Sequence, residues 1–281
     1  MQRKQYTLAK SIEFSGIGIH TGKNVTMRFC PAPPSTGIIF KRMDLPSQPM
    51  IPATVEYVID TSRSTILGLG DVRVHTVEHV LAALRAFEID NLFIEIDNLE
   101  PPVGNGSSDI FVELIEKAGK KASDMTIPIL QLKEPLYYSE KEIQIIALPA
   151  EYFRISYTLS YPSHPLLKAQ FHDTIISSEL FKTNIAPCRT FSLYEELSFL
   201  MDKGLIKGGS LDNAVVIHSE AVYSKGGLFF PDEMVRHKIL DMIGDLTLVG
   251  IPFNAHIISL KSGHASNYQF AKKLLKSLTK E

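Results

Sequence analysis

The sequence predicts an α+β protein made of two similar layered halves, and three observations support this. Strand-like segments precede helix-like segments, and this order occurs twice along the chain. A polar stretch at residues 120–126 separates the two runs. The length of 281 residues is enough for two ordinary domains. We therefore expect domains at residues 1–125 and 126–281, with the functional site in the cleft between them.

The first half is expected to begin with short strands. Residues 25–29 alternate between apolar and polar side chains, and residues 37–41 follow a turn rich in Pro, Ser and Thr. Residues 72–74 begin and end with valine, which favours strands. Residues 92–97 are expected to form a further strand. These segments predict a sheet.

Two helices are expected in the same half. The first is indicated by apolar residues at helical spacing, namely Val77, Val80, Leu81 and Leu84. The second is predicted at residues 110–118, because Ser107, Ser108 and Asp109 are N-cap candidates and Gly119 is a typical helix end.

The second half repeats this order without a sequence repeat at fixed spacing. Its expected strands are residues 129–132, 143–148, 153–159 and 254–260. Its expected helices are residues 193–203, 233–248 and 265–278. Helices laid on one face of each sheet would give two similar layered halves.

Composition excludes several classes of protein. With 44% hydrophobic residues, 21% charged residues and a net charge of −2, neither disorder nor a surface for nucleic acid is expected. The two cysteines, Cys30 and Cys188, lack CxxC spacing, which argues against a disulfide framework or a thiolate metal site. No signal peptide or membrane span is visible, so we expect a cytoplasmic protein.

One predicted helix carries polar residues that are candidates for metal binding. His237, Asp241 and Asp245 are spaced by four and lie on one helical face, with Lys238 beside them. A His and a carboxylate one turn apart can both point at one ion. The alternative is an ordinary His–Asp ion pair on a solvated face.

A second candidate pair, Glu78 and His79, lies where a strand ends and a helix begins. Neighbouring residues on a helix point in different directions, which suits one metal ligand and one general base. The alternative is a helix start that simply favours a carboxylate in its first turn.

Together these segments supply His79, His237 and Asp241, a three-ligand set that leaves one coordination position open for water. Such a set suits one catalytic zinc ion per chain, and ferrous iron as well. A further histidine, His264, lies where a strand enters the last helix and could donate a proton to a leaving group. A lone histidine in such a turn is more often structural.

Several motifs, taken in order, resemble one family, the UDP-3-O-acyl-N-acetylglucosamine deacetylases of lipid A biosynthesis. The resemblance spans nearly the whole chain. It consists of SGIGIHTG (15–22), PAPPSTGIIFKR (31–42), HTVEHVLAAL (75–84), DNLFIEID (90–97), APCRTF (186–191), KGGSLDNAVV (207–216), VRHKILDMIGDL (235–246) and KSGH (261–264).

The resemblance implies a fold of two β-α-α-β halves, each with an inserted element, and a zinc ion on the three ligands. It also implies hydrolysis of the N-acetyl group of UDP-3-O-acyl-N-acetylglucosamine to acetate and a free amine, an early committed step of lipid A biosynthesis. Glu78 would be the general base. Zinc and the Thr190 hydroxyl would stabilise the oxyanion, and His264 would be oriented by Asp245.

The resemblance further implies contacts with this small-molecule substrate. Lys238 would meet an anionic or carbonyl oxygen, Phe191 would pack near the sugar, and Tyr161 would stack on uracil. Residues 193–211 would form an apolar passage for the acyl chain, although composition alone fits an amphipathic core helix equally well. The remaining predicted substrate contacts are His20, Leu200, Gly209 and Ser210. A monomer is expected.

Three residues depart from the family pattern as we understand it. Asn105 stands where an Asp is usual, Arg63 where an uncharged residue is expected near the site mouth, and Ser160 where an acidic residue is frequent. None is a predicted metal ligand. Two alternatives stay open at this point: a zinc amidohydrolase for another N-acylated compound, and a nucleotide-sugar or lipid-binding protein without catalysis. Neither the acyl length nor whether Glu78 or His264 protonates the leaving amine follows from the sequence.

Overall fold

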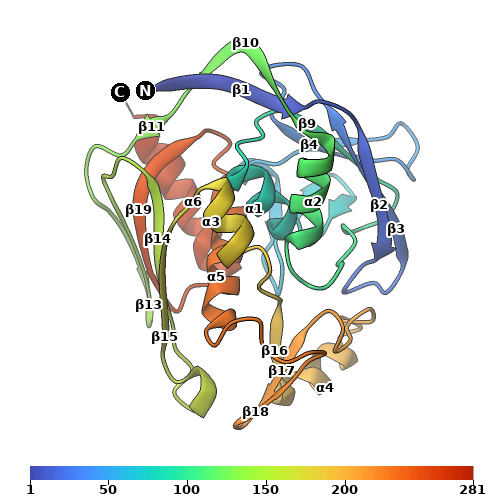
Figure 1. Cartoon of the computed structure of the whole chain (residues 1–281), viewed down its shortest axis with the longest axis vertical. Helices are drawn as coiled ribbons and strands as arrows, with labels where there is room; N and C mark the ends of the chain where they lie inside the picture. Colours follow the sequence, from blue (N-terminus) through green and yellow to red (C-terminus); the bar gives the residue numbers. More distant parts are fainter. Residues whose placement is uncertain (281) are drawn as a thin grey trace.

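The computed structural model of the chain describes residues 1–280. Two sheets lie on opposite sides of the molecule with helices between them, and a smaller lobe projects at the end where α4 and β16–β18 are labelled (Figure 1). None of the helices in these 280 residues is both long and apolar enough to cross a bilayer.

The N-terminal half is built on one five-stranded sheet. Its strands, in spatial order, are β2 (Ile12–Ile17), β3 (Asn24–Pro31), β9 (Leu92–Ile96), β4 (Ile38–Arg42) and β5 (Met50–Pro52). Its two helices are α1 (Glu78–Ala86) and α2 (Asp109–Ala118). In β9 the alternate residues Leu92, Ile94 and Ile96 are fully buried, because side chains of a strand point to opposite faces of the sheet.

The C-terminal half repeats this topology strand for strand. The corresponding order is β12 (Leu136–Glu140), β13 (Ile143–Leu148), β19 (Phe253–Leu260), β14 (Phe153–Leu159) and β15 (Gln170–Ile175). Among these five strands of each sheet, only one pair runs parallel, β9 with β4 and β19 with β14. The short β11 (Leu130–Gln131) also pairs with β19. The helices are α3 (Ser178–Asn184), α5 (Glu233–Thr247) and α6 (His264–Leu278).

Each half carries an insert. It lies between β5 and α1 in the N-terminal half and between α3 and α5 in the C-terminal half. In the N-terminal half the insert contains η1 (Val55–Tyr57) and the three strands β6 (Val58–Asp60), β7 (Ile66–Leu69) and β8 (Val72–Val74). In the C-terminal half it contains β16 (Phe191–Leu193), α4 (Tyr194–Asp202), β17 (Val215–His218) and β18 (Ala221–Tyr223). A 3-10 turn, η2 (Pro165–Leu167), lies between β14 and β15. The predicted α+β fold of two similar halves with inserts is therefore confirmed.

The expected boundary at residues 120–126 lies in a strand instead of a loop. β10 (Lys120–Pro128) pairs antiparallel with β1 (Gln2–Leu8), a strand that the sequence did not reveal. Nearly every residue of β10 is exposed, so no apolar alternation marks it. The division into two domains at residue 125 stays a prediction.

The start of α2 differs in detail from the prediction. The Ser107 hydroxyl accepts a hydrogen bond from the Asp109 amide, as an N-cap side chain does. Ser108 is the N-cap residue, but its side chain does not cap the helix, because its hydroxyl donates to the carbonyl oxygen of His79 at 2.9 Å. The second serine thus ties α2 to α1.

Helices α1 and α5 form the central contact between the two halves, and a glycine allows their close approach. A Cβ atom on Gly244 would lie 2.1 Å from the carbonyl oxygen of Glu78, closer than atoms can approach. The first turn of α1 therefore lies directly against α5.

Candidate metal centre and its cavity

The contact between α1 and α5 brings together the three predicted metal ligands. His79 Nε2 lies 3.6 Å from Asp241 Oδ1, and His237 Nε2 lies 3.3 Å from the same oxygen. One ligand atom of each residue lies within 4.8 Å of the others. All three residues are at least nine-tenths buried. A pair of imidazole nitrogens and a carboxylate oxygen converging in this way fits one zinc or ferrous ion.

Neighbouring groups orient these ligand atoms. His237 Nδ1 lies 3.0 Å from the carbonyl oxygen of Cys188 and donates to it, which leaves Nε2 free of a proton and facing Asp241. The second oxygen of Asp241 accepts from Lys238 Nζ at 2.8 Å. His237 and Asp241 therefore each have their second polar atom held by the protein, as is usual for the outer partners of metal ligands.

The protonation states also fit a metal centre. Burial lowers the pKa of His237 to about 3, so its imidazole is neutral. Burial alone would raise the pKa of Asp241, but the neighbouring His237 imidazole and Lys238 ammonium hold it well below its usual range. Burial alone would lower the pKa of Lys238, but the Asp241 carboxylate raises it above its ordinary value. The centre thus offers the neutral imidazole of His237 and the carboxylate of Asp241 beside the imidazole of His79.

Glu78 and His264 lie beside the three ligands and face each other. Glu78 Oε1 is 3.9 Å from His264 Nε2, and burial raises the pKa of Glu78. His264 Nδ1 lies 3.0 Å from Asp245 Oδ2, which also accepts from the Asn267 side-chain amide at 2.9 Å. Burial would lower the pKa of His264, but the carboxylates of Asp245 and Glu78 raise it to about 10.

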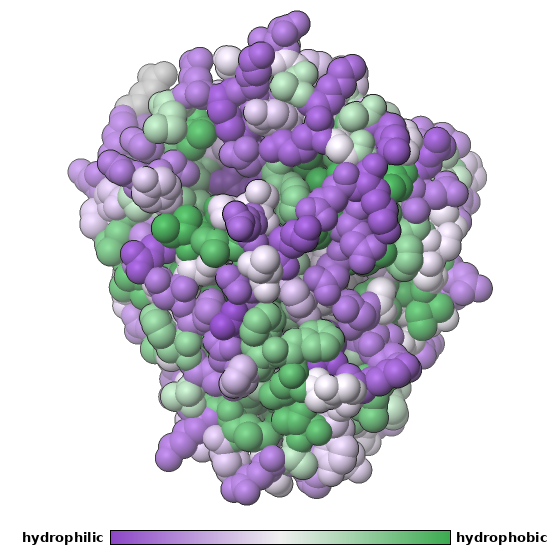
Figure 2. Space-filling model, in the orientation of Figure 1, coloured by the Kyte–Doolittle hydropathy of each residue, from purple (hydrophilic) through white to green (hydrophobic). Residues whose placement is uncertain are grey.

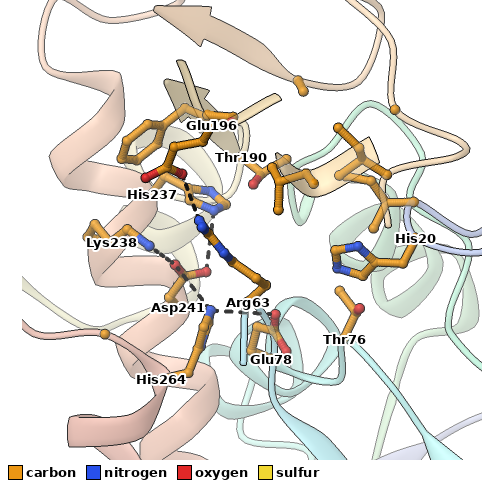
Figure 3. A pocket seen from close by; sticks show the side chains of 18 of the residues that line it. His20, Arg63, Thr76, Glu78, Thr190, Glu196, His237, Lys238, Asp241 and His264 are labelled. Carbon is orange, nitrogen blue, oxygen red and sulfur yellow. Dashed lines mark hydrogen bonds and ion pairs between the residues drawn. The ribbon is translucent and has the colours of Figure 1, made fainter. Parts of the chain in front are cut away.

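These groups line a cavity of about 690 Å³ between the two halves. Figure 3 shows Glu78 and His264 at one end, His237 and Asp241 on the same helix, and His20 across the cavity. Of the predicted site residues, all but Asp245 line it. Those lining it beyond the metal ligands and their neighbours are Tyr161, Thr190, Phe191, Leu200, Gly209 and Ser210. Asp245 lies behind His264 and is 1% exposed.

Two aromatic side chains are placed close to polar groups of the site. The Phe191 ring lies edge-on to the His237 ring, with centroids 6.3 Å apart, and Lys238 Nζ lies 5.5 Å from the Phe191 centroid. Tyr161 lines the cavity near the edge of His164, at a centroid distance of 6.4 Å. The predicted stacking of Tyr161 on a base stays a prediction.

One arm of the cavity is apolar and is formed by the C-terminal insert. Its lining includes Leu193, Leu197, Leu200, Met201 and Ile206. The segment from α4 onward, expected as either passage or core, is mostly partly exposed, with Phe199 and Met201 more than half exposed. Figure 2 shows apolar surface gathered at the end of the molecule where Figure 1 places this insert. The packing is too open for a plain core helix.

The glycine-rich segment at residues 15–22 joins the two halves at the far side of the cavity. The amides of Lys207 and Gly208 donate to the carbonyl oxygens of His20 and Ile19, at 3.2 and 3.0 Å. A Cβ on Gly208 would lie 2.2 Å from the Gly18 carbonyl oxygen, so glycine is required there. His20 has a buried Nδ1 without a protein partner, and it faces the cavity.

Sequence reasoning missed several residues that hold the site together. Thr65 donates to both Glu78 and Asp245. Glu100 is 1% exposed and accepts from the amides of His20 and Thr21. The sequence gives no signal for these contacts, because Thr65 follows Ser64 and the partners of Glu100 are about 80 residues away in the chain.

The three departures from the family pattern have distinct surroundings. Asn105 accepts from both the amide and the hydroxyl of Ser107, so its side-chain oxygen still acts as an acceptor. Arg63 donates to Glu196 on α4 at 2.7 Å, across the cavity that both residues line (Figure 3). Ser160 donates to the carbonyl oxygen of Lys168. None of the three contacts a predicted metal ligand through these bonds.

Comparison with known proteins places this chain in a family. Residues 5–276 match the family model described as UDP-3-O-acyl N-acetylglycosamine deacetylase. Relatives named UDP-3-O-acyl-N-acetylglucosamine deacetylase include those of Chlamydia felis, 48% identical over 278 residues, and Chlamydia pneumoniae, 48% identical over 279 residues. Each alignment covers 99% of both chains. The relative from Chlamydia trachomatis serovar L2 is 45% identical over 279 residues, covering 99% of this chain and 97% of its own. The chain belongs to the UDP-3-O-acyl N-acetylglycosamine deacetylase family.

Proposed function

We propose that this member of the deacetylase family hydrolyses the N-acetyl amide of UDP-3-O-acyl-N-acetylglucosamine. Water adds to the amide carbon, the carbon–nitrogen bond breaks, and acetate and the free amine of the sugar are released. The step belongs to lipid A biosynthesis. The observation that carries the proposal is the buried carboxylate of Glu78 beside two imidazoles and a carboxylate, all facing one cavity.

Zinc is the ion we propose for His79, His237 and Asp241, with ferrous iron as the alternative. When bound, zinc lowers the pKa of a coordinated water to about 7 and polarises a carbonyl oxygen. The ligand set fits, because His237 is held as the neutral tautomer with Nε2 toward Asp241.

The side chains around the ligands supply the proton transfers. Glu78 takes a proton from the attacking water, and its raised pKa suits a base working near neutral pH. His264 donates its Nδ1 proton to Asp245 and, because its raised pKa keeps the ring cationic, carries a second proton at Nε2, 3.9 Å from Glu78. From that position it stabilises the developing negative charge or protonates the departing amine. Thr190 also lines the cavity, and its hydroxyl would donate to the oxyanion.

Substrate contacts follow from the shape of the cavity. The apolar arm around Leu200 receives the acyl chain, and Gly209 and Ser210 line the wall beside it. Phe191 packs near the sugar, and Lys238 presents its ammonium next to that ring. His20 and Tyr161 also line the cavity, and we assign Tyr161 to the uracil ring.

The decisive experiment combines metal analysis with mass spectrometry of the acylated UDP sugar, following loss of acetyl. Glu78→Gln should keep about one equivalent of metal and lose most turnover, because only the base is removed. His79→Ala and Asp241→Ala should lose the metal as well. Undiminished turnover in Glu78→Gln would refute the assigned base.

Two alternatives are separated by the same assay. An amidohydrolase for another N-acylated compound would turn over without dependence on acyl-chain length, whereas an enzyme using the apolar arm should depend on it. A binding protein without catalysis would release no acetate. The burial of Glu78 beside the open side of the ligand set favours catalysis, since binding alone requires no base there.

A further inference from the structure

Thr65 lies immediately before β7, in the N-terminal insert, and is 1% exposed. Its amide donates to Glu78 Oε2 at 3.0 Å, and its hydroxyl donates to Asp245 Oδ1 at 2.5 Å. Its carbonyl oxygen accepts from the amide of Val77 at 3.3 Å, one residue before α1 begins. Three polar groups of one residue are therefore used at the junction of the two halves.

The two carboxylates that Thr65 contacts have their other oxygens committed to the reaction. Glu78 Oε1 faces His264, while Oε2 is held by Thr65. Asp245 Oδ2 accepts from His264 and Asn267, while Oδ1 is held by Thr65. Among residues 1–280, Thr65 alone makes hydrogen bonds to both carboxylates. Thr65 therefore binds the oxygen of Glu78 that faces away from His264, in the N-terminal half, and the oxygen of Asp245 that His264 does not use, in the C-terminal half.

This occupation matters because a carboxylate turns easily about its last bond. Terminal torsions of Glu and Asp have broad, roughly two-fold minima, so packing alone sets their planes poorly. A hydroxyl donating to a buried carboxylate makes a short, charge-assisted bond that fixes both plane and position. Holding Asp245 holds the His264 ring, because Asp245 is the side-chain partner of Nδ1.

We propose that Thr65 is a positioning residue for the deacetylation, acting on His264 through Asp245 and on Glu78 through its amide. This inference rests on the proposed function and adds a residue from the N-terminal insert to the machinery. Thr65 does not touch the substrate. Its effect is on how often Glu78 and His264 face the reacting amide together, so it acts on kcat rather than on binding.

The test removes the hydroxyl and keeps the shape. Thr65→Val retains the amide donor to Glu78 and the β-branched form, but loses the donor to Asp245. We expect kcat to fall about tenfold, the scale of losses for outer partners of metal-site ligands. KM should stay within about twofold and metal content should be unchanged. Thr65→Ser, which keeps the hydroxyl, should restore kcat. A tenfold loss in Thr65→Ser would overturn the proposal even if Thr65→Val fails to fold.

A double-variant cycle tests the route through Asp245. In an Asp245→Ala background, Thr65→Val should change kcat by less than about twofold, because the partner is already absent. The full tenfold loss in that background would contradict the route. The matched control is Thr174→Val, since Thr174 is a buried threonine whose hydroxyl donates to the Ile175 carbonyl oxygen and which is not among the residues lining the cavity. Its kcat should equal that of the native chain.

The outcomes also separate this inference from the function on which it rests. If the native chain releases no acetate from the acylated UDP sugar, both are wrong. If the native chain is active and Thr65→Val keeps the native kcat, only the role of Thr65 is wrong.

Discussion

Helix α5 has a histidine–aspartate pair near each end. The distance between the paired atoms is the same, but the pKa of the histidine is shifted in opposite directions. Near its start, His172 Nδ1 lies 3.0 Å from Asp232 Oδ2, and near its end His264 Nδ1 lies 3.0 Å from Asp245 Oδ2. Burial and the charge of Arg236 lower the pKa of His172. The pKa of His264 is raised to about 10. The hydrogen bond is thus the same, and its surroundings decide what the histidine can do.

The difference lies in which charges surround each pair. Asp232 also accepts from Arg236 Nε at 2.7 Å, so its negative charge is already balanced. His264 faces Glu78 and Asp241 in addition to Asp245, and all three carboxylates are at least 97% buried. An excess of buried negative charge keeps His264 protonated, whereas balanced, partly exposed charges keep His172 neutral. The cavity lies at the His264–Asp245 pair, where the histidine is protonated and can donate a proton.

Matched substitutions should produce the largest contrast between the two pairs. His264→Gln is expected to lower kcat by about 10²–10⁴-fold, the usual contribution of a positioned acid or base. His172→Gln should change kcat by less than about twofold, because His172 lies outside the cavity. Steady-state kinetics on the acylated UDP sugar would measure both. Equal losses in the two variants would show that the surroundings of the pairs do not matter.

The close approach of α5 to α1 should be the next most sensitive feature. Gly244→Ala places a methyl group where the Glu78 carbonyl oxygen lies. The helices must separate, and we expect a loss of about 1–3 kcal/mol in the free energy of unfolding, as for other overpacked contacts. Urea denaturation would measure it. If Gly244→Ala had the same urea midpoint and the same kcat as the native chain, the helices would tolerate the methyl group and their close contact would be contradicted.

Stability of the metal-free protein should respond to pH with opposite signs at the two pairs. The raised pKa of His264 gives stability that is complete below the unfolded value of about 6.5 and lost as pH rises through about 10. The lowered pKa of His172 costs stability as pH falls through about 6.5, because the unfolded chain binds the proton first. Tm measured from about pH 5.5 to 10 would test both.

The variants make this comparison specific. The Tm advantage of the native chain over His264→Gln should shrink toward the alkaline end. On acidification, the native chain should lose more Tm than His172→Gln does. The same pH trend in both comparisons would contradict the assignment of opposite charge states.

The smallest effect is expected at the exposed ion pair between the inserts. Arg63 and Glu196 have side chains about 40% exposed, at 41% and 38%. A double-variant cycle with Arg63→Gln and Glu196→Gln should give a coupling of about 0.2–1 kcal/mol in stability, which disappears at high salt. Glu195→Gln, on the same helix, is the control. A coupling that persists in high salt would show that the pair is more enclosed than its exposure suggests.

Much of the fold was predictable because a strand or helix with one buried face has apolar residues at regular spacing in its sequence. The alternation in β9 and the helical spacing in α1 and α5 reflect one buried face each, and all three predictions are confirmed. Strand β10 is exposed along almost its whole length, and β1 buries only Gln5 and Leu8, so neither strand shows an apolar alternation in the sequence. Pairing between them depends on backbone hydrogen bonds, which any residue except proline can make.

The sequence by itself determined that His237, Asp241 and Asp245 share a helical face, because 3.6 residues per turn brings positions four apart together. It also indicated, through ordered motifs, which family the chain resembles. The tertiary structure alone decided that His79 meets His237 and Asp241, since these segments are distant in the chain and join only where Gly244 admits α1. It likewise decided the contacts of Thr65, because a buried hydroxyl chooses its acceptor from whatever the packing brings near.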